Sequence, residues 1–146
     1  MSVTPLKILQ AEDDDDDRFL FNRAIKKAEI ITEIVYARDG DECLDKLKTY
    51  IPDIIFLDIN MSGMNGRECL KLIRKQNIFD DIPIIILTTS NHESDITDTF
   101  QSGANLFVIK PFRYEDLSVL LKKIFTGNWK TDLMNRDAEN YVLSSE

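Results

Sequence analysis

Five short apolar runs alternate with longer amphipathic segments along the first 126 residues. The runs are Ile8–Ala11, Ile34–Ala37, Ile54–Leu57, Ile84–Leu87 and Leu106–Ile109. Several of them are apolar at every position, which is typical of strands in a parallel sheet that is covered on both faces. The pattern therefore predicts five buried strands.

The intervening segments carry apolar residues at helical spacing. The predicted helices cover about Asp16–Glu29, Asp41–Tyr50, Gly66–Gln76, Glu93–Ser102 and Tyr114–Thr126. Five successive βα units predict an α/β fold with a doubly wound five-stranded parallel sheet, right-handed crossovers and five flanking helices.

The regular pattern stops after Thr126. We expect one domain over residues 1–126 and a C-terminal tail over 127–146 that is too short for a second domain. Trp129 and Leu133 lie four positions apart, so they could pack a short tail helix onto the domain.

Composition narrows the class of protein. The chain is 43% hydrophobic and 30% charged, with a net charge of −8, which describes an ordinary folded domain and argues against nucleic-acid binding. Cys43 and Cys69 form no CxxC pair, so we expect buried, reduced thiols. Neither a leader peptide nor an apolar run of about 18 residues is present, which predicts a cytoplasmic protein without a membrane span.

Polar side chains follow four of the five predicted strands. Glu12 and Asp13 end the first strand, Asp58 the third, Thr88 the fourth and Lys110 the fifth. In a parallel sheet, functional groups gather beyond the carboxyl ends of the strands. We therefore expect these side chains to meet at one edge of the sheet.

The chemistry of this set is coherent. Three carboxylates held together attract a cation, and oxygen ligands without Cys or His favour a hard ion such as Mg²⁺. A carboxylate is also a nucleophile that can carry an aspartyl-phosphate. Mg²⁺ and the Lys110 ammonium could neutralise a phosphoryl group, and the Thr88 hydroxyl could hydrogen-bond it.

Other polar residues have simpler interpretations. Asp16 and Asp17 fit acidic residues that favour a helix N-terminus, while Asp14 and Asp15 remain undecided. His92, the single histidine, is expected to be a solvated loop residue.

Four motifs resemble the receiver domains of two-component response regulators. They are ILQAEDD, FLDINMSGMNG, ILTTS and IKPF, in this order and on the expected strands. The resemblance covers about residues 7–126. Within the family, the chain is similar to stand-alone receivers of the chemotaxis-regulator type, including those that serve bacteriophytochrome kinases.

The resemblance implies a role for each site residue. Asp58 would be the phosphoacceptor. Asp13 would bind Mg²⁺ directly, Glu12 would bind it directly or through water, and the Asn60 backbone carbonyl would complete the protein ligands. Together with Asp58, these form the implied metal site.

Three further positions follow from the same resemblance. Thr88 and Lys110 would contact the phosphoryl group, and Thr88 with Phe107 would form the conformational switch. The Lys110–Pro111 peptide bond would be cis. Ser62 departs from the family, which often has proline there, and we expect it to loosen the loop after Asp58.

The implied fold is flavodoxin-like with strand order 2-1-3-4-5. The implied function is a single-domain switch that takes a phosphoryl group from a sensor histidine kinase or a phosphotransfer protein and has no output domain. It would not be a multiple-turnover enzyme and would signal to an unidentified protein target. The face made by the fourth helix, fifth strand and fifth helix would serve a partner or a homodimer.

Three alternatives remain open. A haloacid-dehalogenase-like phosphatase would need a second aspartate two residues after the nucleophile, where this chain has Asn60. A flavodoxin-like binding module would need a loop rich in Ser, Thr and Gly after the first strand, where five aspartates stand. A phosphorylation-independent docking module would lack a site residue, and none is missing.

Overall fold

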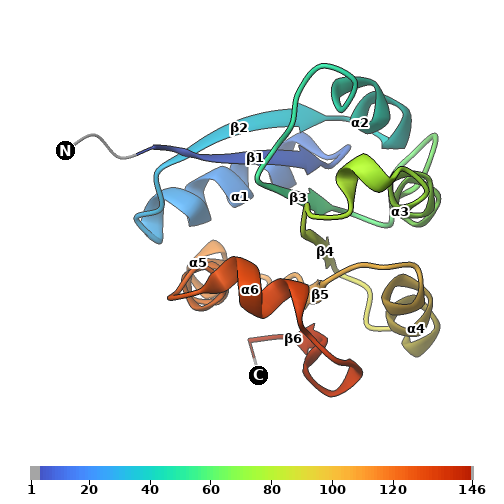
Figure 1. Ribbon diagram of the computed structural model, residues 1–146. Coiled ribbons are helices and arrows are strands. Elements are labelled where there is room, and N and C mark those ends of the chain that lie inside the picture. Colours follow the sequence, from blue (N-terminus) through green and yellow to red (C-terminus); the bar gives the residue numbers. More distant parts are fainter. Residues whose placement is uncertain (1–3, 146) are drawn as a thin grey trace.

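A parallel six-stranded sheet runs through the computed structural model, which describes residues 4–145 (Figure 1). The strand order is β2-β1-β3-β4-β5-β6, and every neighbouring pair is parallel. The strands are β1 Leu6–Ala11, β2 Thr32–Ala37, β3 Ile54–Leu57, β4 Ile84–Thr88, β5 Leu106–Ile109 and β6 Val142–Leu143. The predicted order of the first five strands is confirmed, and the sixth strand was not predicted.

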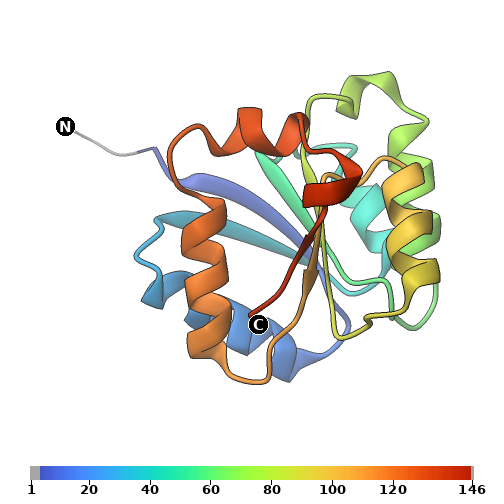
Figure 2. The same ribbon diagram turned by 90° about the horizontal axis from the view of Figure 1, so that it is seen from below.

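Helices cover both faces of this sheet (Figure 2). The α-helices are α1 Asp15–Lys27, α2 Gly40–Lys46, α3 Gly66–Arg74, α4 Glu93–Gln101, α5 Tyr114–Ile124 and α6 Trp129–Met134; single turns of 3₁₀-helix occupy Asn77–Phe79 and Ala138–Asn140. Helices α1 and α5 pack on one face, and α2, α3 and α4 pack on the other. None of the helices over residues 4–145 is long and apolar enough to cross a membrane.

The central strands are apolar throughout because both of their faces are buried. Every residue of β3 and β4 is buried, and their side chains alternate between two separate cores. Ile55 and Ile86 contribute to the core under α3 and α4, whereas Ile54 and Ile85 contribute to the core under α1 and α5. The uninterrupted apolar runs in the sequence therefore reflect a doubly covered sheet.

Polar caps set where the helices begin. The side chains of Asp14, Asp39 and Asn65 accept hydrogen bonds from backbone N–H groups in the first turns of α1, α2 and α3.

The five predicted helices extend one to four residues beyond their actual C-terminal ends. The largest difference is in α2, where residues 47–49 form a turn after the helix ends at Lys46.

The C-terminal tail packs against the sheet and the core beside it. Its helix α6 buries Leu133, as the spacing of Trp129 and Leu133 predicted. Strand β6 then pairs with β5, and the Phe107 N–H donates to the Tyr141 carbonyl oxygen at 2.8 Å. This pairing covers the backbone edge that β5 would otherwise expose.

Candidate functional site

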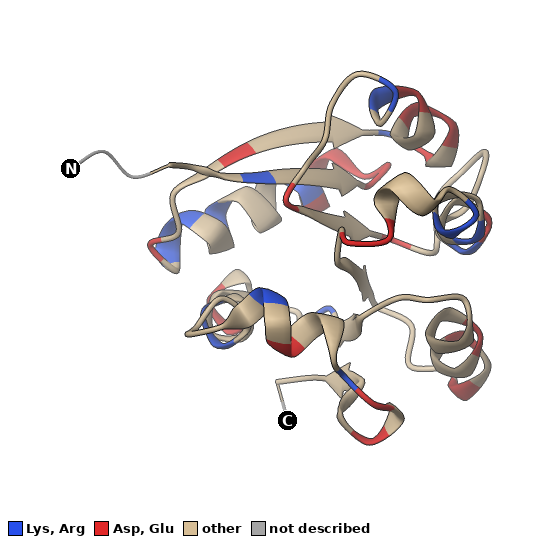
Figure 3. Ribbon diagram, viewed as in Figure 1, with Lys and Arg blue, Asp and Glu red and all other residues tan. Residues whose placement is uncertain are grey.

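The predicted site residues meet at the carboxyl ends of the central strands, where acidic residues follow β1 (Figure 3). The Lys110 ammonium, carried just after β5, lies 2.8 Å from Glu12 Oε1 and 3.7 Å from Asp58 Oδ2. Glu12 is 2% exposed and Asp58 is 7% exposed. One partly buried cation thus lies beside two buried carboxylates that follow separate strands.

Burial and charge compete at this cluster. Burial raises the pKa of Glu12 to about 7, although the hydrogen bond from Lys110 opposes this rise. Burial alone would lower the pKa of Lys110, but the hydrogen bond to Glu12 and the charges of Glu12, Asp58 and Asp17 raise it overall. Lys110 therefore stays positively charged at neutral pH.

Asp58 is fixed by its own loop. Its Oδ1 accepts a hydrogen bond from the Asn60 backbone N–H at 2.9 Å, and its N–H donates to the Ala11 carbonyl oxygen at 3.1 Å. The first residue of α3, Gly66, lies directly against the Asp58 carbonyl, so that a Cβ at this position would collide with it. The phosphoacceptor candidate is therefore held by β1, its own loop and the start of α3.

Asp13 does not contact Lys110 and is instead bound by Ser62. Its Oδ2 accepts hydrogen bonds from the Ser62 backbone N–H at 3.0 Å and the Ser62 hydroxyl at 3.2 Å. Our expectation that Ser62 loosens the loop is wrong. Proline could not donate its nitrogen here, whereas serine supplies two donors that tie the loop to β1's end.

Thr88 and Phe107 lie on the same side of the sheet. The buried Thr88 hydroxyl accepts a hydrogen bond from the Ser90 N–H at 3.3 Å, and the Asn60 side-chain amide lies 3.5 Å away. Phe107 is completely buried, with the Tyr141 ring 6.0 Å from its own. The expected partner face therefore does not expose Phe107, because the tail covers it.

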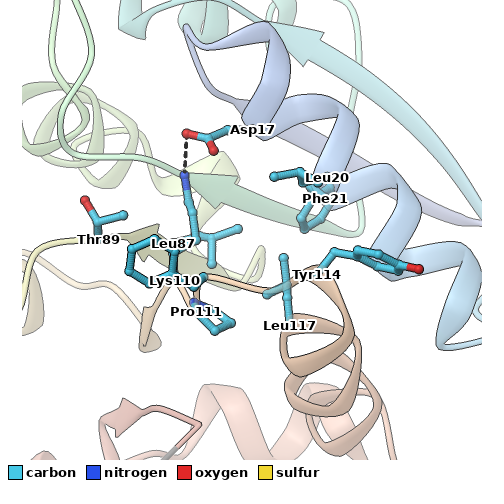
Figure 4. A pocket seen from close by; sticks show the side chains of 10 residues that line it. Asp17, Leu20, Phe21, Leu87, Thr89, Lys110, Pro111, Tyr114 and Leu117 are labelled. Carbon is cyan, nitrogen blue, oxygen red and sulfur yellow. Dashed lines mark hydrogen bonds and ion pairs between the residues drawn. The ribbon is translucent and has the colours of Figure 1, made fainter.

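Sequence reasoning missed the role of Asp17. The residue does not only occupy the first turn of α1, because its Oδ2 also lies 3.2 Å from Lys110 Nζ (Figure 4). Nothing in the local sequence separates it from Asp16. The contact arises because α1 begins beside the end of β5.

The acidic residues of the predicted metal site have other partners in this structure. Across residues 4–145, no group of three His, Cys, Asp or Glu side chains is gathered closely enough to hold a metal ion. In this structure Lys110 pairs with the Glu12 carboxylate, and Ser62 donates to Asp13. The metal-binding roles of Glu12, Asp13 and Asp58 therefore stay predictions.

The donor set still suits a hard cation. Mg²⁺ commonly uses only one or two carboxylates and keeps several waters. Asp13, Asp58 and the Asn60 carbonyl supply oxygen alone, without a competing thiolate or imidazole. The residues present thus fit Mg²⁺, provided that only part of the acidic set binds it.

The expected cis peptide bond is absent. The Lys110–Pro111 bond is trans, as are all peptide bonds described over residues 4–145. The trans form is the lower-energy one even before proline.

The sequence of this chain matches one family of known proteins. Residues 8–122 match the response regulator receiver domain family. The response regulator Rcp1 of Synechocystis sp. is 29% identical over 130 residues, which cover 84% of this chain and 88% of Rcp1. The nitrate/nitrite response regulator protein NarL of Escherichia coli is 32% identical over 123 residues, which cover 84% of this chain but 56% of NarL.

Solved structures agree with these matches. The phosphorylated cyanobacterial phytochrome response regulator RcpA superposes with a TM-score of 0.76 at 30% identity, covering 83% of this chain and 91% of RcpA. The Mn²⁺-bound form of Rcp1 superposes with a TM-score of 0.74 at 29% identity, covering 82% of this chain and 91% of Rcp1. The chain therefore belongs to the response regulator receiver domains, the phosphoacceptor modules of two-component signalling.

Proposed function

We propose that Asp58 accepts a phosphoryl group from a sensor histidine kinase or a phosphotransfer protein, with Mg²⁺ as the cofactor. The observation that carries this proposal is the partly buried Lys110 ammonium, 3.7 Å from Asp58 Oδ2 at the carboxyl edge of the sheet. A buried carboxylate beside a fixed cation is suited to a step that adds negative charge.

The chemistry follows from the positions of these groups. An Asp58 oxygen attacks phosphorus, the bond from phosphorus to the donor imidazole breaks, and the donor nitrogen leaves with the bonding pair. Lys110 offers its N–H groups to the phosphoryl oxygens, and the Thr88 hydroxyl donates to one of them. Mg²⁺, held by Asp13, Asp58 and the Asn60 carbonyl, would neutralise charge when bound.

The alternatives fit this site less well. Asn60, two residues after Asp58, carries an amide that lies 3.5 Å from the Thr88 hydroxyl and cannot act as a general acid or base. This argues against rapid phosphatase turnover and favours a phosphoacceptor switch. All the acidic, Thr and Lys positions are present, which argues against a docking module that ignores phosphorylation.

The output of this switch would be a protein–protein contact. Thr88 moves toward the new phosphoryl oxygens, and Phe107 responds on the same face of the sheet. The outer surfaces of α4 and α5, with the tail between them, are the proposed site for a target protein or a homodimer. We propose that residues 1–126 form the receiver, that residues 127–146 form a tail docked on it, and that the protein acts in the cytoplasm. RcpA is by its name a phytochrome response regulator, so a phytochrome-type kinase is a candidate phosphoryl donor for this chain.

Acetyl phosphate with Mg²⁺ tests the assignment directly. The wild type should gain one hydroxylamine-labile phosphoryl group by intact-protein mass spectrometry, and EDTA should prevent it. Asp58→Asn should abolish the gain. The matched control is Asp53→Asn, because Asp53 precedes β3 at the opposite end, where it accepts the Lys7 N–H at 2.8 Å. Full labelling of Asp58→Asn would refute the proposal.

A further inference from the structure

We infer that Asp17 is a positioning residue that holds the Lys110 ammonium in the resting state and competes for it with an incoming phosphoryl group. This inference rests on the proposed function of Asp58. Through Asp17, the first turn of α1 would help to set how readily Asp58 accepts a phosphoryl group.

Lys110 lies among three carboxylates but is closer to two of them than to Asp58. Its Nζ lies 2.8 Å from Glu12 Oε1, 3.2 Å from Asp17 Oδ2 and 3.7 Å from Asp58 Oδ2. An ammonium has three N–H donors. Two of them go to carboxylates other than Asp58, and the pair with Asp58 is beyond hydrogen-bond distance.

Asp17 is held in place for this contact. Its backbone N–H donates to the Asp14 side chain at 3.1 Å, which is the N-cap of α1. Its carboxylate lines a pocket of about 320 Å³ together with Lys110, and the apolar side chains of Leu20 and Leu87 line the same pocket (Figure 4). The position of Asp17 is therefore set by the helix, while its side chain remains 34% exposed.

Phosphorylation changes the balance at Lys110. The phosphoryl oxygens would draw the Lys110 ammonium toward Asp58, and Asp17 is the least buried partner that this movement would weaken. Glu12, at 3% side-chain exposure, has no comparable access to water. The phosphoryl charge also repels the Asp17 carboxylate through space. Asp17 thus opposes occupation of the site on both counts.

The test compares three single variants of the whole chain. Asp17→Asn removes the charge but keeps the shape, and Asp17→Glu keeps the charge. Asp16→Asn is the matched control, because Asp16 is an exposed neighbour on the same turn and its loss changes the net charge equally. Beryllofluoride affinity with Mg²⁺ is measured by ¹⁹F NMR, and the labelling rate is measured against acetyl phosphate concentration.

Asp17→Asn should bind beryllofluoride about three- to tenfold more tightly than Asp16→Asn. This is the effect expected from removing one nearby negative charge that solvent partly screens. The half-saturating acetyl phosphate concentration should fall by a similar factor with little change in the limiting rate. Asp17→Glu should stay near the wild type. In a Lys110→Gln background, the part of the Asp17→Asn effect that acts through Lys110 should disappear, and only the smaller through-space repulsion should remain. A merely structural role of Asp17 would leave the effect at full size there.

Each outcome separates the two proposals. If wild-type labelling depends on Asp58 but Asp17→Asn matches Asp16→Asn, or binds more weakly, only the inference about Asp17 is overturned. If the wild type neither binds beryllofluoride nor becomes labelled, the proposed function fails, and the inference fails with it.

Discussion

Glu12 is the residue at which burial and function conflict most clearly. Its carboxyl group is buried at the end of β1 beside the Lys110 ammonium, which Asp58 and Asp17 also approach. Burial therefore raises its pKa from 4.5 to about 7. Keeping this group ionised costs stability, which is the consequence of placing a carboxylate beside Asp58, the proposed phosphoacceptor.

This shift predicts a specific pH dependence. The folded state binds the Glu12 proton more tightly than the unfolded state does, so protonation of Glu12 stabilises the fold. This contribution to the free energy of unfolding is complete below pH 4.5 and is lost as pH rises through 7. In Mg²⁺-free buffer, the wild type should lose on the order of 1–3 kcal/mol over this interval relative to Glu12→Gln. Urea unfolding of both proteins at several pH values measures the difference, and parallel pH profiles would contradict it.

At the scale of elements, the start of α3 determines how Asp58 is held. Gly66 opens the helix and lies against the Asp58 carbonyl because it has no Cβ. The side chain of Asn65 caps the same turn by accepting the Glu68 N–H at 3.1 Å. The helix can thus approach β3's end closely without a side chain in between.

Gly66→Ala should therefore disturb both the fold and the site. The new methyl group must push α3 away from Asp58, which should cost about 1–3 kcal/mol, the usual range for overpacking. Labelling by acetyl phosphate should also slow, because the Asp58 loop moves with the helix. Chemical denaturation and the labelling rate check the two effects; a variant as stable and as reactive as the wild type would show that the contact is easily relieved.

At the scale of the whole molecule, the tail closes the edge of the sheet and covers the predicted switch residue. Tyr141 is 1% exposed, and its hydroxyl lies 2.7 Å from the Thr99 hydroxyl of α4. Its ring packs 5.0 Å from the Phe100 ring, measured between centroids. Any partner that approaches β5 must therefore contact or displace the tail.

Two substitutions measure how firmly the tail docks. Tyr141→Ala should lower the free energy of unfolding by about 3–5 kcal/mol, the range for a buried aromatic side chain, unless the tail undocks first and limits the loss. Tyr141→Phe should cost only about 0.5–1.5 kcal/mol, because Thr99 still donates to the Asp95 carbonyl oxygen at 2.8 Å. Urea unfolding gives both values, and a loss below 1 kcal/mol for Tyr141→Ala would mean that the tail is weakly held.

Much of this protein follows from the sequence alone. The apolar runs predicted five strands and their order along the chain, because consecutive residues carry the signal of a doubly covered sheet. The polar residues at the strand ends predicted which side chains would meet, because parallel strands bring their carboxyl ends to one edge. Lys110 beside Asp58 confirms that reasoning.

The tertiary structure decided which of these groups are partners. The sequence could not distinguish Asp17 from Asp16, predict that Ser62 binds Asp13, or predict that Tyr141 covers Phe107. Strand β6, with two residues, is too short for a periodic signal. These features depend on distances between residues far apart in the chain, which arise only when helices and strands pack. Local patterns therefore determined the elements and the edge of the site, whereas packing between elements determined its charge pairing.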